Sequence, residues 1–366
     1  MSPSIQNLEN LLAALPPEDR ALFDRIFHLT VAQGHLNCPP TMEKWLKEQF
    51  GSVEAVAEQR IIKLTNLVTW EGALFNPLRS QRPVGLKEEI GTEGLVVNGL
   101  DEDPFLNPEE NTPQDTFGRV KGKHCITASN AAKYDALHAL IIFDEPNPLH
   151  LSPEQLRDYL ETAWKWAELA HSSDPEARHF FFIWNCLWRA GASLVHGHAQ
   201  VALGRGLPYA KVEALRRAAA SYRLQYGSDY FEDLYRVHSA LGCGAERGQV
   251  RAISYLTPVK DKEVLLFAPD LGPALADALY DVLRGLREKL GVLSFNLALM
   301  TPPLGEPEPG WEGFPVLARV VDRGDPASRA CDVGAMELYA SSVIASDPWA
   351  VAAVLKEYLS PEASLG

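Results

Sequence analysis

The sequence predicts an α+β fold with two similar halves, each a mainly antiparallel sheet with packed helices, behind an N-terminal helical extension. One observation is a recurring order of elements, in which two apolar strands, a helix that begins near a proline and two more strands follow one another. The other is the spacing of that recurrence: Leu140 and Val264 are 124 residues apart, and Pro153 and Pro273 are 120 apart. A near-constant period indicates duplication. We therefore expect an extension (1–70), a first half (71–207) and a second half (208–366).

Bulk composition excludes several classes of protein. A chain of 366 residues is long enough for two or three packed units. Its net charge of −14 and pI near 5.2 argue against general binding to nucleic acid or to an anionic membrane. No apolar run approaches the ~20 residues of a membrane span, and the N-terminus lacks the pattern of a signal peptide. The five cysteines are scattered, as is typical of reduced thiols, so we expect a cytoplasmic protein.

The extension shows apolar residues at spacings of three and four, which predict helices throughout residues 4–68. Leu8, Leu11 and Leu12 begin the pattern, and Pro16 and Pro17 stand before a first turn that contains acidic residues. We expect this segment to serve packing or the formation of a homodimer rather than catalysis.

In the first half we expect strands at 124–127, 137–143 and 180–184, and a helix that runs from 153 to about 171. Ser152 and Gln155 form a capping box for that helix. A helical stretch at 208–241 links the halves.

In the second half we expect strands at 249–255, 263–267, 293–300 and 314–321. The helix between the second and third of these strands ends at Gly291, and a last helix runs from about 347 to 359. No histidine occurs after His238, so the second half has no imidazole of its own, and we expect one catalytic centre per chain.

The most informative stretch covers residues 180–203. Asn185 ends an apolar run, a short Gly/Ser turn follows, and His196, His198 and Gln200 then occupy alternate positions. Alternation predicts a strand that places all three side chains on one face. A neutral imidazole with a fixed tautomer is a competent nucleophile toward phosphorus. The alternative is a pair of structural or metal-binding histidines.

The pattern Asn-x5-Gly-Ala-Ser-Leu-x-His-x-His-x-Gln resembles the active-site signature of the galactose-1-phosphate uridylyltransferase branch of the histidine-triad superfamily, and the diadenosine tetraphosphate phosphorylases have a similar His-x-His-x-Gln. The resemblance implies two histidine-triad-like halves and a nucleotidyl-histidine intermediate on His198. It assigns phosphate positioning to His196, Ser193 and Gln200, and substrate contacts to Asn185 and Gly191. An amide at position 200 is a poor base for activating water, so transfer is favoured over hydrolysis.

The pattern departs from the resembling family at two positions. Gly197 stands where the uridylyltransferases usually have proline, and Leu187 stands where they usually have glycine. These departures support a further alternative, a non-catalytic nucleotide-binding regulator on a degenerate enzyme fold.

Four more residues are predicted to bind substrate. Arg79 and Arg82 belong to an Arg-x-x-Arg-Pro segment that resembles one near the nucleotide in uridylyltransferases; a solvated loop is the alternative. Arg319 and Glu337 are the candidates from the second half, and Glu337 lies in a stretch similar to a sugar-contacting Val-Gly-Tyr-Glu segment.

His138 is a further substrate-binding candidate. It ends an Asn-x3-Tyr-x3-His frame, Asn130 to His138, that is similar to one in the diadenosine tetraphosphate phosphorylases. A polar residue at a strand entrance is the alternative.

The metal content follows from the segment Asp103-Pro-Phe-Leu106. It lies where many uridylyltransferases have Cys-Pro-x-Cys and bind structural zinc, and both cysteines are absent. We therefore predict no zinc and no required cofactor, while a divalent cation such as Mg²⁺ is compatible with the chemistry.

Together these patterns predict a nucleotidyltransferase of the hexose-1-phosphate uridylyltransferase type, whose partners are a nucleotide sugar and a phosphorylated acceptor. The alternative enzyme is a dinucleoside polyphosphate phosphorylase or ATP adenylyltransferase. The Gly-Ala-Ser-Leu and Arg-x-x-Arg-Pro motifs support the uridylyltransferase hypothesis. The alternative has the support of the His138 frame and of a second-half stretch, 296–301, that is similar to the phosphorylases.

Overall fold

A nine-stranded antiparallel sheet forms the centre of the computed structural model, which describes residues 2–81, 103–328 and 331–360. Its strands are, in spatial order, β4 Cys125–Ser129, β5 Leu137–Phe143, β7 His198–Arg205, β6 Ala177–Cys186, β11 Phe295–Met300, β12 Val316–Asp322, β10 Val264–Ala268, β9 Val250–Ser254 and β8 Gly244–Arg247. A separate four-stranded sheet contains β1 Phe27–His35, β2 Glu58–Asn66, β3 Gly72–Phe75 and β13 Ser342–Ile344.

The order of the large sheet reveals the duplication. β6 and β11 pair at its centre, and the strands that flank them follow the same sequence on both sides: β7, β5 and β4 on one, β12, β10 and β9 on the other. A long helix follows β5 in the first half and the matching strand β10 in the second half: α7 Pro153–Ser173 and α10 Pro273–Leu290. The predicted α+β class is confirmed, and the repeated unit inferred from the spacing appears as two halves of one continuous sheet.

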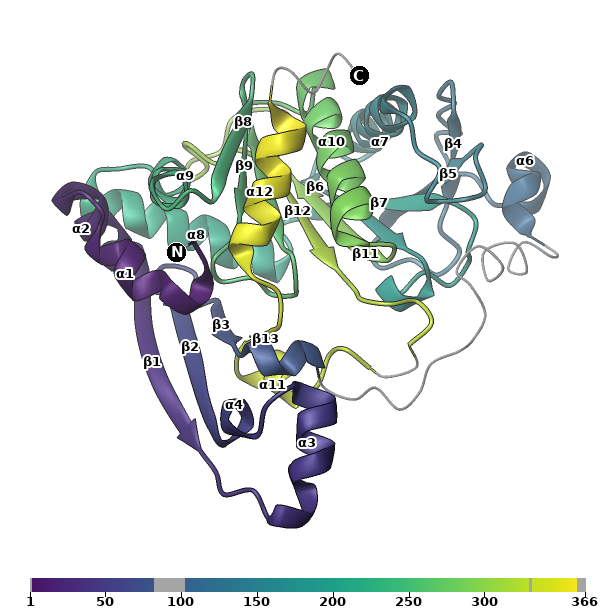
Figure 1. Ribbon diagram of the computed structural model, residues 1–366. Helices are drawn as coiled ribbons and strands as arrows, with labels where there is room; N and C mark the ends of the chain where they lie inside the picture. The colour runs from purple at the N-terminus through teal and green to yellow at the C-terminus, as the bar shows by residue number, and fades with distance from the viewer. Residues whose placement is uncertain (1, 82–102, 329–330, 361–366) are drawn as a thin grey trace.

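One face of the large sheet is covered by α7, α10 and α12 Pro348–Leu359 (Figure 1). The apolar stripes of these helices meet the inward side chains of both halves in the larger core, which includes Trp166, Trp184 and Leu279. The predicted capping box of α7 is present, since Ser152 Oγ accepts from the Gln155 backbone and the Gln155 side chain accepts from the Ser152 backbone.

The opposite face of the second half is covered by the N-terminal segment and by α8 Ala210–Tyr226 and α9 Tyr230–Ala240. The segment contributes α1 Leu8–Ala13 and α2 Pro17–Ile26 to a second core, which also contains Leu265 and Leu317 of the large sheet. The predicted helical stretch 208–241 is thus two helices, because Gly227 ends the first one in a left-handed conformation. The remaining α-helices within the described residues are α3 Glu43–Phe50, α4 Val53–Ala57, α6 Pro108–Asn111 and α11 Ala335–Tyr339.

The prediction that the N-terminal segment is helical throughout is wrong for β1 and β2. These two strands pair over nine residues each and run side by side away from the large sheet, with α3 and α4 near their far end (Figure 1). In β2 the residues Ile62, Leu64 and Asn66 are all buried at alternate positions, a period of two that suits a strand. Short helices precede β1 and lie between β1 and β2, and their apolar residues made the helical spacing look continuous in the sequence.

No helix in the part of the chain that the structure describes is both long enough and apolar enough to span a bilayer.

Candidate active site

Strand β7 separates its side chains as the alternation predicts. Ala199 and Val201 pack into the core beneath α7, whereas His198 and Gln200 lie on the opposite face of the sheet. In the first half, the described residues place on this face a small apolar cluster of Phe105, Ile126, Ala128 and Ile142.

The tautomer of His198 is fixed by its own strand. Its Nδ1 lies 2.8 Å from the carbonyl oxygen of His196, and since a carbonyl only accepts, Nδ1 carries the proton. The lone pair of the neutral ring is therefore on Nε2. Burial, which leaves the residue 7% exposed, lowers the pKa of His198, so the neutral ring persists at lower pH than in a free histidine. A neutral imidazole with an unprotonated Nε2 is the form that a nucleophile requires.

His196 differs from the expectation, because β7 begins only at His198 and His196 precedes it. Its Nε2 donates to the carbonyl oxygen of Phe143 at 2.8 Å, and its Nδ1 is hydrogen-bonded to the carboxylate of Asp103. Both partners are acceptors, so the imidazolium form of His196 satisfies both. Asp103 was not among the predicted site residues; the only signal was its place before Pro104, where the resembling family has cysteine.

Gly197, between the two histidines, is tied to the end of β5. Its N–H donates to the carbonyl oxygen of Pro146 at 2.8 Å, and its own carbonyl accepts from the N–H of Phe143. A Cβ at this position would lie 2.7 Å from Phe143 Cδ2 and 2.9 Å from the oxygen of Glu145. Proline would clash and would also lose the hydrogen bond, so glycine here is a local adaptation of the backbone rather than the loss of a chemical group.

Gln200 is oriented by His138, which lies beneath it and is fully buried. The backbone N–H of Tyr134 donates to His138 Nδ1 at 2.9 Å, so the ring's proton is on Nε2. That nitrogen lies 3.0 Å from Gln200 Oε1 and donates to it. The amide oxygen of Gln200 is thereby directed at His138, and its NH₂ group is left to face away as a donor. Burial lowers the pKa of His138, which preserves this arrangement.

Asn185 lies near the end of β6, and Gly191 and Ser193 lie in the turn between β6 and β7. Asn185 lies two residues beyond Ile183, the partner of Gln200, on the same face of the sheet. Gly191 has φ of +98°, which explains the need for glycine, and Ser193 is exposed in the turn. Leu187 has φ of +67° where the resembling family usually has glycine, and its buried side chain packs into the core.

A chain of hydrogen bonds leads from Asn185 into the second half. Asn296 Nδ2 donates to Asn185 Oδ1 at 2.7 Å, and Arg323 Nη1 donates to Asn296 Oδ1 at 2.6 Å. The guanidinium of Arg323 also binds both carboxylate oxygens of Asp332 at 3.0 Å.

Asp332 lines a polar cavity of about 810 Å³. Two predicted substrate-binding residues, Arg79 and Glu337, line the same cavity. Its other charged residues are Arg189, Lys260, Lys262, Asp261 and Asp322, so the lining as a whole has four basic and four acidic side chains. Arg82 lies outside the described residues.

Arg319 lies apart from that cavity. Its guanidinium binds Glu263 Oε1 and Glu71 Oε1, both at 2.7 Å. Burial would lower the pKa of Arg319, but the two carboxylates outweigh that effect and raise it. Because the guanidinium already binds two internal carboxylates, the structure places Arg319 in an internal network and does not bring it together with His198.

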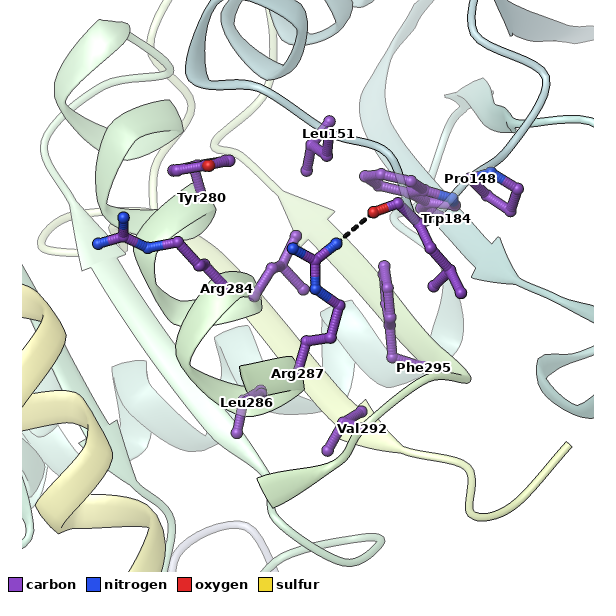
Figure 2. Close-up of a pocket in the computed structure, with 11 residues that line it drawn as sticks. Pro148, Leu151, Trp184, Tyr280, Arg284, Leu286, Arg287, Val292 and Phe295 are labelled. Atoms are coloured by element: carbon purple, nitrogen blue, oxygen red, sulfur yellow. Dashed lines mark hydrogen bonds between the residues drawn. The ribbon is translucent and has the colours of Figure 1, made fainter. Parts of the chain in front are cut away.

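A smaller cavity of about 30 Å³ lies on the helix-covered side of the sheet, between α10 and the loop before α7 (Figure 2). Its lining is mostly apolar, including Trp184, Leu286 and Phe295, and Arg287 in that lining donates to the carbonyl oxygen of Leu149. A space of this size accommodates about one water molecule, so it is not a nucleotide site.

Zinc does not fit the segment that corresponds to the metal-binding place of the resembling family. Leu106 offers no ligand atom and is 55% exposed, and His196 Nδ1 is already bound to Asp103. Among the described residues, no group of three or more His, Cys, Asp or Glu side chains is placed to hold a metal ion.

Comparison with known proteins supports the fold. The chain matches no protein-family model and no curated protein sequence. Among solved structures, it is similar to an ADP-glucose phosphorylase from Arabidopsis thaliana with bound ADP-glucose, with a TM-score of 0.61 and 15% identity over 80% of this chain and 97% of the other. A GalT-like protein from Arabidopsis thaliana gives 0.60 and 16% over 80% and 98%. A uridylyltransferase gives 0.55 and 16% over 82% and 98%.

The chain has the fold of the GalT-like proteins. This confirms, at the level of the fold, the resemblance inferred from the histidine motif.

Proposed function

We propose that this chain is a nucleotidyltransferase that forms a nucleotidyl-histidine intermediate on His198. The observation that carries the proposal is a neutral imidazole whose Nδ1–H is held by a carbonyl and whose Nε2 is unprotonated, beside a glutamine amide with a fixed orientation. A histidine with only a structural role has no need of the second feature.

In the first step, Nε2 of His198 attacks the α-phosphorus of a nucleoside diphosphate sugar. The N–P bond forms, the bond from phosphorus to the bridging oxygen breaks, and the sugar 1-phosphate leaves. The positive charge that develops on the ring is stabilised through Nδ1–H by the carbonyl of His196. In the second step, a phosphate oxygen of the acceptor attacks the same phosphorus and the N–P bond breaks, which restores the lone pair.

Gln200 and Ser193 fit the task of donating to the phosphoryl oxygens. His196 does not donate to them here, because its two ring nitrogens are already bound to Asp103 and to the carbonyl oxygen of Phe143. The NH₂ group of Gln200 is a donor, because His138 occupies its oxygen. A glutamine held in this way does not act as a base toward water, which favours transfer to an acceptor over hydrolysis.

The substrate class that we favour is a nucleoside diphosphate hexose together with a sugar 1-phosphate. The Gly-Ala-Ser-Leu motif and the position of Arg79 in the large polar cavity support it. One structural neighbour was crystallised with ADP-glucose and others are uridylyltransferases, so both ADP-glucose and UDP-glucose are donors to test.

A dinucleoside polyphosphate phosphorylase is the second candidate. Its support is the Asn130–Tyr134–His138 frame, whose members lie together: the ring of Tyr134 stacks on that of His138 with centroids 4.5 Å apart.

The experiment is incubation of the chain with radiolabelled UDP-glucose, ADP-glucose and diadenosine tetraphosphate, followed by measurement of covalent label and of donor–acceptor exchange. We expect stoichiometric, acid-labile label from one donor class and exchange only when the matching phosphorylated acceptor is present. His198→Gln is expected to abolish both, whereas His150→Gln, a change at an exposed histidine, leaves them intact. Nucleotide binding without label or exchange would instead identify a non-catalytic regulator.

A further inference from the structure

We propose that Asp103 is a positioning residue for the nucleophile: it holds His196 as a buried cation and provides, without metal, the tie that orders the start of β7. This inference rests on the proposed function, since it assigns Asp103 a part in the same site.

The first step is the ion pair itself. The side chains of Asp103 and His196 are each only 2% exposed, and the carboxylate contacts Nδ1 of the ring. The other ring nitrogen donates to the carbonyl of Phe143 at the end of β5. His196 therefore joins the 103–106 segment, β5 and the start of β7, and its cationic form is required for both bonds.

The second step connects this pair to His198. The carbonyl that holds Nδ1–H of His198 belongs to His196, so the position of His196 sets the direction of the nucleophile. Phe105, two residues after Asp103, packs edge-to-face against both rings, with centroids 5.7 Å from His196 and 5.3 Å from His198. Loss of the carboxylate would release both the carbonyl and the aromatic contact.

The third step concerns charge. An imidazolium beside the nucleophile disfavours the positive charge that His198 develops on attack, and the carboxylate of Asp103 offsets it. Within the described part of the chain, the other titratable groups that face His196 are His198 and Asp144, and His124 faces Asp144 in turn. Among these, Asp103 is the one whose hydrogen bond fixes the proton on Nδ1 of His196.

The fourth step is the contrast with zinc. In the resembling family, the corresponding segment is tied down by a metal through two cysteines. Here Asp103 occupies the place of the first and binds the imidazole directly, and Leu106 occupies the place of the second. A carboxylate–imidazolium pair performs the structural task of the metal, and the expected enzyme is insensitive to chelation.

The test compares Asp103→Asn and Asp103→Ala with Glu110→Gln, a control at an exposed acid close by in the chain. Single-turnover labelling gives the rate of nucleotidylation, and a separate titration gives the Kd for UMP. We expect Asp103→Asn, which preserves shape but not charge, to slow nucleotidylation about 10–100-fold while Kd is nearly unchanged. Asp103→Ala is expected to be slower still, and Glu110→Gln to match the wild type.

A second readout does not depend on activity. In ¹⁵N-histidine NMR spectra at neutral pH, His196 of the wild type is expected to carry protons on both nitrogens, and in Asp103→Asn on Nε2 alone. Prolonged chelation is expected to leave the labelling rate of the wild type unchanged.

Three results would overturn the proposal: equal labelling rates in Asp103→Asn and the wild type, a neutral His196 in the wild type, or a chelation loss that zinc restores. Failure of the wild type to form any adduct would refute the proposed function, and the NMR spectra would still decide whether Asp103 holds His196 as a cation.

Discussion

Gln200 and Arg319 occupy the same row of the large sheet, one in each half. Gln200 pairs with Ile183, Arg319 pairs with Ala298, and Ile183 and Ala298 pair with each other at the centre. Among the described residues, the side chain of Gln200 is hydrogen-bonded to His138 through Oε1, whereas the guanidinium of Arg319 is bound between Glu71 and Glu263. The two halves therefore have side chains with different partners at the same position of the sheet.

The difference follows from what covers each half. The N-terminal segment packs over this face of the second half, and Glu71, which directly follows that segment in the chain, binds Arg319 of β12. Over the first half, the described residues form only the small cluster around Phe105, and His198 and Gln200 lie on this face with 7% and 8% of their surface exposed. We propose that the second half serves stability, while the first half carries the nucleotidyl transfer proposed for His198.

The largest expected effect is a loss of unfolding free energy when Arg319 of the second half is replaced. Arg319→Met leaves the carboxylates of Glu71 and Glu263 without their partner, and breaking a buried ion pair in this way costs about 3–5 kcal/mol of unfolding free energy. Urea unfolding measures it. Addition of Glu263→Gln to that variant removes one of the uncompensated charges, so we expect it to recover part of the loss. If Arg319→Met lowers the unfolding free energy by less than about 1 kcal/mol, these ion pairs do not stabilise the contact between the large sheet and the segment that contains Glu71.

The next effect is the pH dependence contributed by His238, the last histidine of the chain. It is fully buried; Nδ1 donates to the carbonyl of Leu234 and Nε2 accepts from Leu256, and burial lowers its pKa to about 4. Because the folded-state pKa of His238 is depressed, the neutral ring contributes fully to the unfolding free energy above pH ~6.5. As pH falls toward 4, about 3 kcal/mol of unfolding free energy is lost. His138 and His198 act in the same direction.

Unfolding free energies at pH 7 and pH 4 measure this contribution in the wild type and in His238→Gln. We expect the variant to be less stable at pH 7 and to lose less on acidification. An equal loss in both proteins would assign the acid sensitivity to other groups.

The smallest effect concerns the first half. His138→Phe preserves the ring but removes the donor to Gln200, so the amide loses its fixed orientation. We expect nucleotidylation to slow about tenfold, in line with one neutral hydrogen bond. Single-turnover labelling measures it, and His179→Phe, at a histidine that donates to Gly206 instead, serves as the control. Unchanged labelling in His138→Phe would leave His138 with a packing role.

Much of the fold followed from local patterns. The predicted strand 137–143 matches β5, the capping box begins α7, and alternation after Gly197 places His198 and Gln200 on one face. Such features depend on residues within one turn or one strand of each other, where period and capping chemistry are decisive. β1 and β2 were missed because short helices beside them share the spacing of apolar residues.

The contacts that complete the site could not be predicted, since they join distant parts of the chain. Asp103 and His196 are 93 residues apart in sequence, and Arg319 and Glu71 are 248 apart. Periodicity shows which face a side chain occupies, but it does not show which loop crosses that face. For the same reason Arg319 was predicted to contact substrate, although the structure encloses it with two acids.

The central claim is that one histidine of the first half carries the nucleotidyl group, and peptide mapping of the labelled protein tests it most directly. After incubation with the active donor, protease digestion under alkaline conditions and fragmentation by mass spectrometry locate the modified residue. We predict one nucleotidyl group per chain on His198, and none on His196 or on any histidine outside β7. An adduct on another residue, or none with any donor that supports exchange, would contradict the account.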